Sequence, residues 1–132
     1  MTPSTDEQKD VIQVGLSPAG KAVLKEMEDQ FVIATQLDGY LLAIALAVRA
    51  GLQPSAERAS ERETMYSMGS VDPDGNLRLM IRELYPQASS WAARAAESLA
   101  EQGVSLLANH KIGDEYWLSS MCPDASAAGS AE

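Results

Sequence analysis

Apolar side chains are most concentrated between Tyr40 and Ala50, where only the Tyr40 hydroxyl and Arg49 are polar. A helix over these residues is apolar on every face, so protein or lipid must surround it. The uninterrupted apolar run after Asp38 is shorter than the ~18–20 residues that cross a bilayer. The pattern therefore predicts a buried helix without membrane contact, capped at its N-terminus by Asp38 and shared between subunits. Its predicted oligomer core consists of Leu41, Leu42, Ile44, Leu46 and Val48.

Before this helix, the polarity pattern predicts a short strand and then an amphipathic helix. Residues 11–16 alternate with period two, as a half-buried strand does. Ser17 and Pro18 favour a helix start, since Ser is a good N-cap and Pro is tolerated at the first helical position. Apolar residues then recur at i, i+4 and i+8, which predicts a helix to about Gln30. One face of the strand carries Ile12, Val14 and Leu16.

This order of strand, amphipathic helix, turn and apolar helix is similar to a ribbon-helix-helix unit, in which two chains pair their strands. Readers of DNA in that class insert outward strand side chains into the major groove. Here Lys9, Val11 and Gln13 would take that role, and one amide with one lysine makes a poor reader of bases. Equally open is the alternative that residues 11–16 only lead into a helical bundle.

Beyond the apolar helix, Gly51 is expected as the C′ residue, and Pro54 bars continuation. Residues 64–71 favour a second strand. The turn that follows has acidic and amide groups at the spacing of a calcium loop, but Leu77 stands where such a loop requires Gly. A β-turn and a helix cap that uses the Asn76 side chain explain the same residues. The groups with that spacing are Asp72, Asp74, Asn76 and Glu83.

Two further helices are predicted. The first spans residues 77–84 and ends before Pro86, with Leu77, Met80, Ile81 and Leu84 as its core-facing stripe. On its outer face lie Arg78 and Arg82, which form either a small patch for a partner or a solvated surface.

The last helix is predicted from Trp91 to about Ala108, capped by Ser89 or Ser90, with alanines and Gly103 permitting close helix packing. The predicted fold is thus mainly α: a small helical domain of about four helices with a short N-terminal strand, over residues 10–118. Residues 1–9 and 119–132 are polar and expected to be disordered.

Charge and residue usage narrow the function. The 132 residues carry a net charge of −9, which repels a phosphate backbone and favours a basic protein partner over nucleic acid. Cys122 is the only cysteine, so an internal disulfide is excluded. His110 is the only histidine, and without a second one acid–base or triad catalysis lacks its usual base. Phosphate-loop, dinucleotide and zinc-protease motifs are missing. We expect no enzyme and no cofactor or metal, and a cytoplasmic location because the first residues lack a signal-peptide pattern.

Three segments, DGYLLAIALAVRAGLQP, DPDGNLRLMIRELYP and AARAAESLAEQGVSLL, are similar in order to small accessory proteins found with bacterial DNA phosphorothioation and related phage-defence operons. The resemblance covers roughly Phe31 to Leu107. It departs at QPSAERASERE, where those proteins carry a Lys- and Arg-rich stretch, and no functional residue is carried across. The resemblance implies a small non-catalytic subunit of a multi-protein antiviral defence or DNA-modification system.

Two functions stay open. In the first, the chain is an acidic adaptor that forms a homo-oligomer through residues 40–50 and docks on a larger protein of the same system. In the second, it is a dimeric ribbon-helix-helix regulator or antitoxin that binds DNA. A regulator needs positive charge around its paired strands, so the net charge favours the adaptor.

Overall fold

The computed structural model describes residues 10–57, 61–109, 111–112 and 115–116. The predicted tails at 1–9 and 119–132 lie outside these residues. The described chain is mainly helical, as predicted, with a short N-terminal strand. Its elements in order are β1 (Gln13–Leu16), α2 (Pro18–Asp29), α3 (Gln36–Arg49), β2 (Glu63–Ser67), α4 (Met68–Val71), α5 (Asn76–Leu84), the 3-10 helix η1 (Pro86–Trp91), α6 (Ala92–Asn109), β3 (Lys111–Ile112) and β4 (Glu115–Tyr116).

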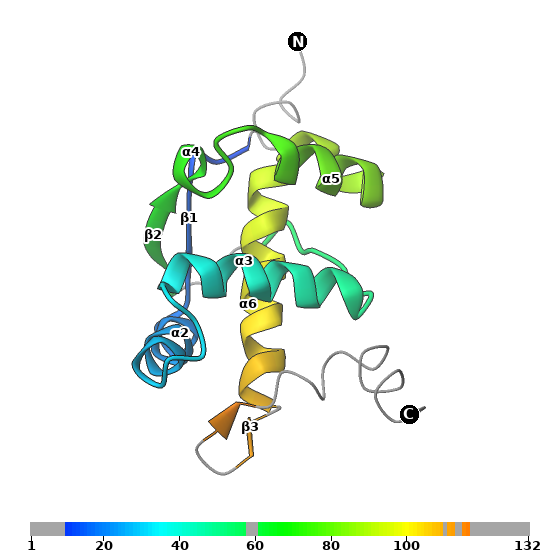
Figure 1. Cartoon of the computed structure of the whole chain (residues 1–132). Coiled ribbons are helices and arrows are strands. Elements are labelled where there is room, and N and C mark those ends of the chain that lie inside the picture. Colours follow the sequence, from blue (N-terminus) through cyan, green and yellow to red (C-terminus); the bar gives the residue numbers. More distant parts are fainter. Residues whose placement is uncertain (1–9, 58–60, 110, 113–114, 117–132) are drawn as a thin grey trace.

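Helix α6 is the central axis of the domain, and α3 crosses it while α2, the β1–β2 pair and α5 lie around it (Figure 1). The crossing is close because Gly103 of α6 lies against the backbone of α3. A Cβ atom at Gly103 would come within 1.8 Å of the Ala43 carbonyl oxygen. The predicted use of small residues for close helix packing is therefore confirmed at this point.

Strand β1 pairs antiparallel with β2 of the same chain, with Leu16 opposite Glu63. A bulge between Val14 and Gly15 interrupts the alternation, and the last three residues of the strand are all buried. The strand begins after Ile12, whose side chain is 79% exposed. The prediction that Ile12 shares the buried face is therefore wrong, since it needs a regular strand from residue 11.

A ribbon-helix-helix unit pairs its strand with the same strand of a second chain, whereas β1 here has its strand partner within the chain. At Gly15 both backbone groups are also taken by side chains: the N–H donates to Glu97 Oε2 at 2.8 Å, and the carbonyl accepts from the Tyr40 hydroxyl at 3.1 Å. The partner strand β2 is shorter than the predicted strand at 64–71, because α4 begins at Met68.

Local signals placed two helix ends correctly. The Ser17 hydroxyl accepts a hydrogen bond from Gly20 N at 3.1 Å at the start of α2. At the end of α3, Gly51 has φ +76° and donates to Val48 O, while Leu52 N donates to Ala47 O, both at 3.0 Å. These two bonds form a Schellman motif, in which glycine is favoured at C′.

The predicted caps of α3 and α6 are wrong. Helix α3 begins at Gln36, so Asp38 lies inside its first turn, and its cap is Thr35, whose hydroxyl accepts from Asp38 N at 3.1 Å. Ser89 and Ser90 lie within η1 rather than at the start of α6. The first turn of α6 donates instead to a side chain from the other end of the chain: Asp10 accepts from Ala93 N at 2.8 Å and from Arg94 N at 3.0 Å.

Phe31 ends α2 in the same way that Gly51 ends α3, although it is not a glycine. Its φ is 62°, its N–H donates to Glu28 O at 3.0 Å, and Val32 N donates to Met27 O at 2.9 Å. A left-handed conformation costs an L-residue roughly 1–2 kcal/mol. Burial of the side chain does not offset this cost, because Phe31 is 93% exposed. Such an outlier points to a role other than stability.

We expect Phe31→Gly to raise the free energy of unfolding by about 1 kcal/mol, because glycine adopts this φ without strain. Urea unfolding followed by circular dichroism measures the change. Phe31→Ala is the matched control, since it removes the ring and keeps a Cβ, and it should bring no gain. A Phe31→Gly variant no more stable than Phe31→Ala would contradict the strain.

Of the residues with calcium-loop spacing, the buried Asp72 caps α5 with its carboxylate. Asp72 Oδ1 accepts from Leu77 N at 3.0 Å, and Oδ2 accepts from Arg78 N at 3.0 Å and Arg78 Nε at 2.9 Å. Burial of Asp72 acts to raise its pKa, but these hydrogen bonds and the Arg78 charge outweigh it and lower the pKa. The predicted turn is present, since Gly75 N donates to Asp72 O at 3.2 Å. The predicted Asn76 cap is wrong: Asn76 is the first residue of the helix, and the Asp72 side chain supplies the acceptor instead.

We expect Asp72→Asn to lower the free energy of unfolding at neutral pH by about 1–3 kcal/mol, because the amide loses charge-assisted bonds. The pKa of Asp72 is lower in the folded than in the unfolded chain, so its stabilisation is complete above the unfolded-state pKa and lost as pH falls through the folded-state pKa. Urea unfolding from about pH 7 to about pH 2 should show the gap between wild type and variant closing in acid. The exposed neighbour Asp74, changed to Asn, is the control, and a gap independent of pH would contradict the cap.

Among the described residues, no helix has the length and apolar character needed to cross a bilayer.

Candidate functional site

The predicted oligomer core divides between the inside and the outside of the domain. Ile44 and Leu46 are 1% and 7% exposed and belong to the chain's own core. They are therefore not available to a second subunit in this fold. Leu41 is 37% exposed, and Leu42 and Val48 are half-buried. A contact between subunits can use only these three of the five residues.

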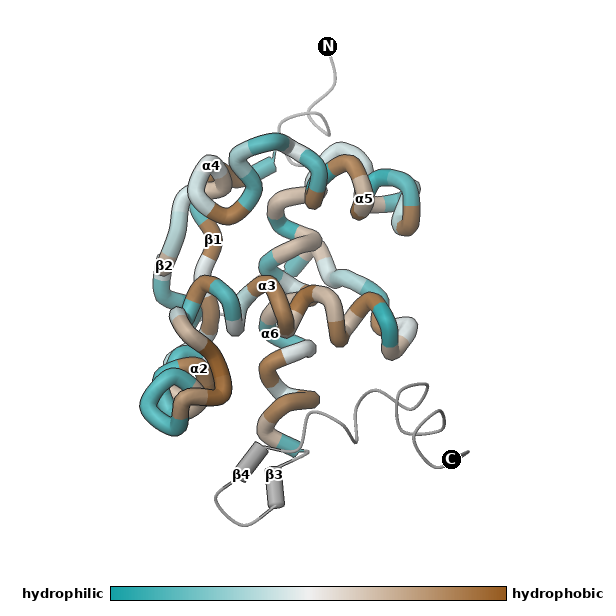
Figure 2. The backbone as a smooth tube through the Cα atoms, in the orientation of Figure 1, coloured by the Kyte–Doolittle hydropathy of each residue, from teal (hydrophilic) through white to brown (hydrophobic). Residues whose placement is uncertain are grey.

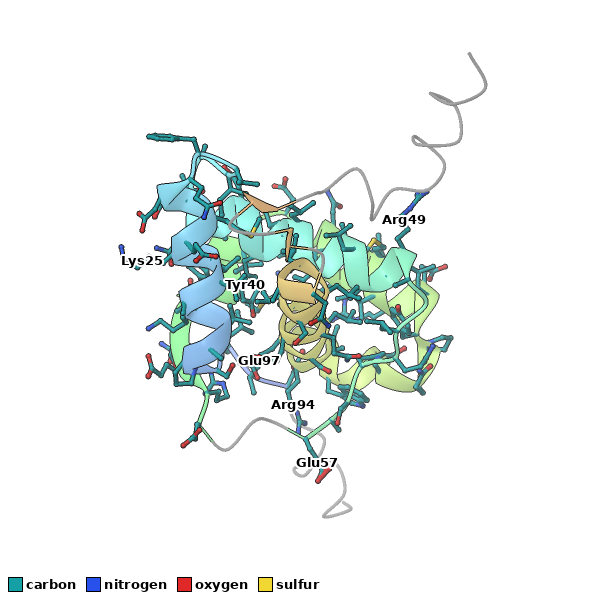
Figure 3. All side chains as sticks on the ribbon, turned by 90° about the horizontal axis from the view of Figure 1, so that it is seen from below. Lys25, Tyr40, Arg49, Glu57, Arg94 and Glu97 are labelled. Carbon is teal, nitrogen blue, oxygen red and sulfur yellow. The ribbon has the colours of Figure 1, made fainter. Side chains whose placement is uncertain are left out.

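The outer face of α3 is apolar along its length. It consists of Leu37, Leu41, Ala45 and Val48, which recur at i, i+4, i+8 and i+11 and are exposed or half-buried. Hydrophobic colour runs along α3 where it crosses in front of α6 in Figure 2. We call these four residues the α3 face. Arg49 lies at the C-terminal end of the helix and points away from the domain (Figure 3).

A second apolar surface lies on α5, where the predicted core stripe is right for Leu77 and Ile81 and wrong for Met80 and Leu84. Ile81 is fully buried and Leu77 half-buried, but Leu84 is 51% and Met80 36% exposed. The neighbouring Leu79 is 55% exposed. We call Leu79, Met80 and Leu84 the α5 face.

The hydroxyl of Tyr85 fixes the C-terminal end of α5 to the segment after α3, because it donates to Leu52 O at 2.9 Å. Burial raises the pKa of this hydroxyl, so it remains protonated and able to donate. The two apolar faces therefore belong to helices that are held together at this end.

The two arginines predicted as a partner patch differ in their surroundings. Arg78 is bound to Asp72 through Nε at 2.9 Å and also donates to the Asp72 carbonyl, so it serves the α5 cap. Arg82 is exposed and donates to Ser89 O at 3.2 Å. The described structure thus brings only Arg82 to the surface as an exposed cation of this pair.

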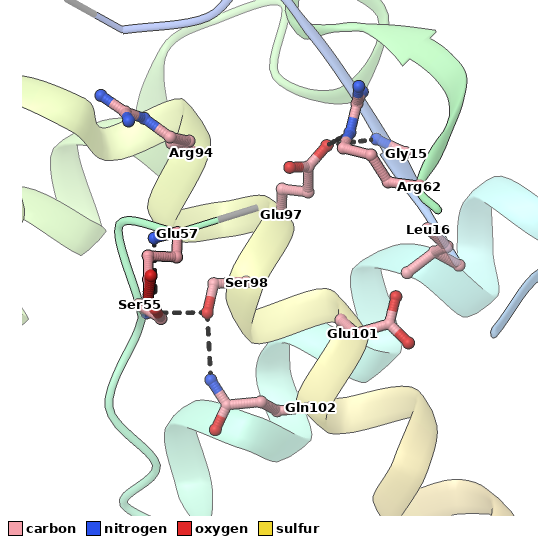
Figure 4. A pocket seen from close by; sticks show the side chains of 10 residues that line it. All are labelled: Gly15, Leu16, Ser55, Glu57, Arg62, Arg94, Glu97, Ser98, Glu101 and Gln102. Carbon is pink, nitrogen blue, oxygen red and sulfur yellow. Dashed lines mark hydrogen bonds and ion pairs between the residues drawn. The ribbon is translucent and has the colours of Figure 1, made fainter. Parts of the chain in front are cut away.

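Sequence reasoning missed a polar cluster around Glu97, a buried residue of α6. Its Oε2 accepts from Gly15 N at 2.8 Å and from Arg62 Nε at 2.7 Å (Figure 4). One turn later, Glu101 accepts from both the N–H and the hydroxyl of Ser17, at 2.8 and 2.7 Å. Two carboxylates of α6 therefore hold the junction between β1 and α2.

Beside this cluster lies a cavity of about 270 Å³, and most of the residues that line it are polar or charged (Figure 4). Its walls already bond to one another: Ser98 accepts from Ser55 N at 2.8 Å and from Gln102 at 3.1 Å. Ligand pockets are usually larger, at ~300–1,000 Å³, and mostly apolar. We therefore interpret the cavity as part of the packing between α6 and the segment after α3, not as a ligand site. The apolar faces are the better candidate site.

The candidate DNA-facing residues are only partly described. Val11 is half-buried and Gln13 is exposed, while Lys9 lies outside the described residues. His110 and Cys122 also lie outside them. Over the described ranges, no group of three or more His, Cys, Asp or Glu side chains is arranged to hold a metal ion.

Comparison with known proteins returns no match to a protein family, to a curated protein or to a solved structure.

Proposed function

We propose that this chain is a non-catalytic adaptor subunit of a bacterial multi-protein system for phage defence or DNA modification. It acts through contacts with other proteins: it associates with itself and docks on a larger partner of the same system. The system is suggested by the resemblance of its three helical segments to accessory proteins of such operons. Its action through protein contacts is supported by its exposed apolar side chains.

The observation that carries the proposal is the pair of apolar faces on α3 and α5. Helices α3 and α5 already contribute Ile44, Leu46 and Ile81 to the chain's own core. The half-buried Leu37 and Val48 of the α3 face pack against that core, and Leu41 and Ala45 are the exposed part of this face. Exposed apolar side chains gathered on one helix face are typical of a protein interaction surface. At 93% exposed and in a strained conformation, Phe31 adds an aromatic group of the kind enriched in interfaces.

Charge indicates the chemistry of the larger partner. The net charge of −9 steers a basic surface toward the chain and repels nucleic acid. We therefore assign the α5 face to a basic protein partner, whose apolar centre would cover Leu79 and Leu84. Of the two contacts, this one joins the chain to the rest of its system.

The ribbon-helix-helix regulator is the second candidate, and one observation counts in its favour: a strand does precede the two helices. The pairing of β1 with β2 in the same chain and the acidic charge count against it. Regulator and adaptor differ in a measurable way, because DNA binding by a basic surface weakens steeply with salt.

A first experiment separates the two candidates by fluorescence anisotropy of a labelled duplex of about 25 base pairs, titrated with the full chain at about 50 and 200 mM salt. The adaptor predicts no binding at either salt concentration. Binding at low salt that fades at high salt would contradict the adaptor and support the regulator.

A second experiment tests the docking face with immobilised full-length chain and an extract of the native host. We expect a basic protein to bind wild type, to bind the Leu79→Ser/Leu84→Ser variant at least ~10-fold more weakly, and to bind the surface control Glu57→Gln unchanged. The retained protein is then purified and its Kd measured by calorimetry with all three chains. A partner that binds the α5 variant as tightly as wild type would contradict this assignment.

A further inference from the structure

We infer that the α3 face binds the same face of a second copy of this chain, with the two α3 helices antiparallel about a two-fold axis. The inference rests on the proposed function in one respect, namely that the chain associates with itself. It adds the surface, the orientation of the two copies and the residues that set this orientation.

The charges at the two ends of α3 carry the argument. Asp38 lies in the first turn and Arg49 is the last residue of the helix, and both are exposed. They are 49 − 38 = 11 residues apart, which is close to three helical turns, so they project from the same side. That side borders the α3 face, with only apolar residues of the face between the two charges.

A two-fold axis perpendicular to the helices, midway between residues 38 and 49, exchanges the two ends. Each border of the face on one helix then lies against the same border of the face on the other helix, but the two helices run in opposite directions. A side chain near the start of one helix therefore faces a side chain near the end of the other. Asp38 of each copy therefore lies opposite Arg49 of the other, and two ion pairs form. This is the self-complementary pattern of a two-fold interface, in which residue i contacts residue j and j contacts i.

The centre of the face fits this close arrangement. Ala45, near the midpoint of α3, is small and exposed, and Leu41 and Val48 flank it. Small residues at a crossing let two helix backbones approach, as Gly103 and Ala43 already do inside the domain. A parallel arrangement would instead gather both Asp38 side chains at one end and both Arg49 side chains at the other, so neither end would hold an attractive pair.

The size of the face sets the strength of the contact. The 14 residues of α3 span about 21 Å, so one helix pair buries less than the ~1,200 Å² of a standard interface. We therefore expect a dimer that forms and dissociates with concentration, with a Kd of about 10–100 μM. A weak contact of this kind suits a subunit that associates when a larger partner gathers several copies.

The test measures the Kd of the full chain by sedimentation equilibrium, for wild type, Asp38→Arg, Arg49→Asp and the double variant Asp38→Arg/Arg49→Asp. Each single substitution turns two attractive contacts into repulsive ones, so we expect the dimer to weaken about tenfold. The double variant should return to the wild-type Kd. An equimolar mixture of the two single variants should also associate like wild type, because their charges are then complementary between copies.

Lys25→Glu is the control, because it changes the charge on the exposed side of α2, away from the α3 face (Figure 3), and should leave the Kd close to that of wild type. Single variants that dimerise like wild type would overturn the antiparallel arrangement, since a parallel one is indifferent to these substitutions. A wild type that stays monomeric at about 500 μM, well above the expected Kd, would overturn the inference altogether. Docking through the α5 face would then still stand on its own experiment, so the two failures are distinguishable.

Discussion

Replacing Glu97 with alanine is expected to lower the free energy of unfolding by about 3–5 kcal/mol, the usual loss when one partner of a buried ion pair is removed. The change leaves the Arg62 guanidinium, 18% exposed, without its carboxylate and Gly15 N without its acceptor. Both groups bond to the same oxygen, Oε2. The variant should therefore detach β1 and β2 from α6 and unfold at much lower urea concentration.

Two control variants separate this effect from a general loss of charge. Glu97→Gln keeps an acceptor for Gly15 and should lose less than Glu97→Ala. Asp29→Ala removes an exposed ion pair with Lys25, whose N–O distance is 3.4 Å, and should change the free energy by no more than ~0.5 kcal/mol. A Glu97→Ala chain whose free energy of unfolding lies within about 1 kcal/mol of wild type would show that the cluster does not hold β1 and β2 on α6.

Gly103→Ala is the second change with a large expected effect, a loss of about 3 kcal/mol or more. Alanine is the better helix former by ~1 kcal/mol, so propensity alone would stabilise the variant. The added Cβ would lie 1.8 Å from the Ala43 carbonyl oxygen and 2.4 Å from its carbon. These atoms belong to the α3 backbone, so the two helices must move apart. Thermal unfolding followed by circular dichroism measures the loss.

Gly69→Ala is the matched control for this substitution. It makes the same chemical change in helix α4, where the nearest atom to the added Cβ would be the Ser67 hydroxyl at 3.8 Å. It should be neutral or slightly stabilising. A Gly103→Ala chain that melts at or above the wild-type temperature would mean that the α3–α6 crossing tolerates a wider separation.

Features set by neighbouring residues could be predicted from the sequence. The start of α2 at Ser17 and the end of α3 at Gly51 each depend on a cap within a few residues, and both were predicted. The cap of α3 was misplaced by one turn for a similar reason. Thr35 and Asp38 are both good caps, and only the bond from Asp38 N to the Thr35 hydroxyl identifies which one acts.

Features set by distant residues could not be predicted. Asp10 caps α6 across 83 and 84 positions of the chain, so no local pattern near Ser89 reveals it. Glu97 and Glu101 look like solvated residues of a polar helix stripe, and their roles depend on where β1 and Ser17 lie. The small residues of α6 indicate close helix packing. They therefore predict that another helix crosses α6 near them, but not that this helix is α3.

The candidate surfaces show a further limit of periodicity. A stripe of apolar residues predicts a face but not what covers it. Ile44 and Leu46 were predicted to meet a second subunit, yet they are buried in the core of the same chain. Met80 and Leu84 were predicted to face the core, yet they face outward. The proposed contacts use the apolar side chains of α3 and α5 that the chain's own core leaves exposed.

The central claim is that the α3 face is the surface through which two copies meet, and disulfide cross-linking tests it most directly. In a Cys122→Ser background, Ala45→Cys places a thiol near the middle of the face, and Ala50→Cys places one at the helix end on the opposite side. Oxidation at about 500 μM protein, above the expected Kd, should link two copies of the Ala45→Cys chain and leave the Ala50→Cys chain monomeric on a non-reducing gel. Equal cross-linking of both variants, or of neither, would contradict the claim.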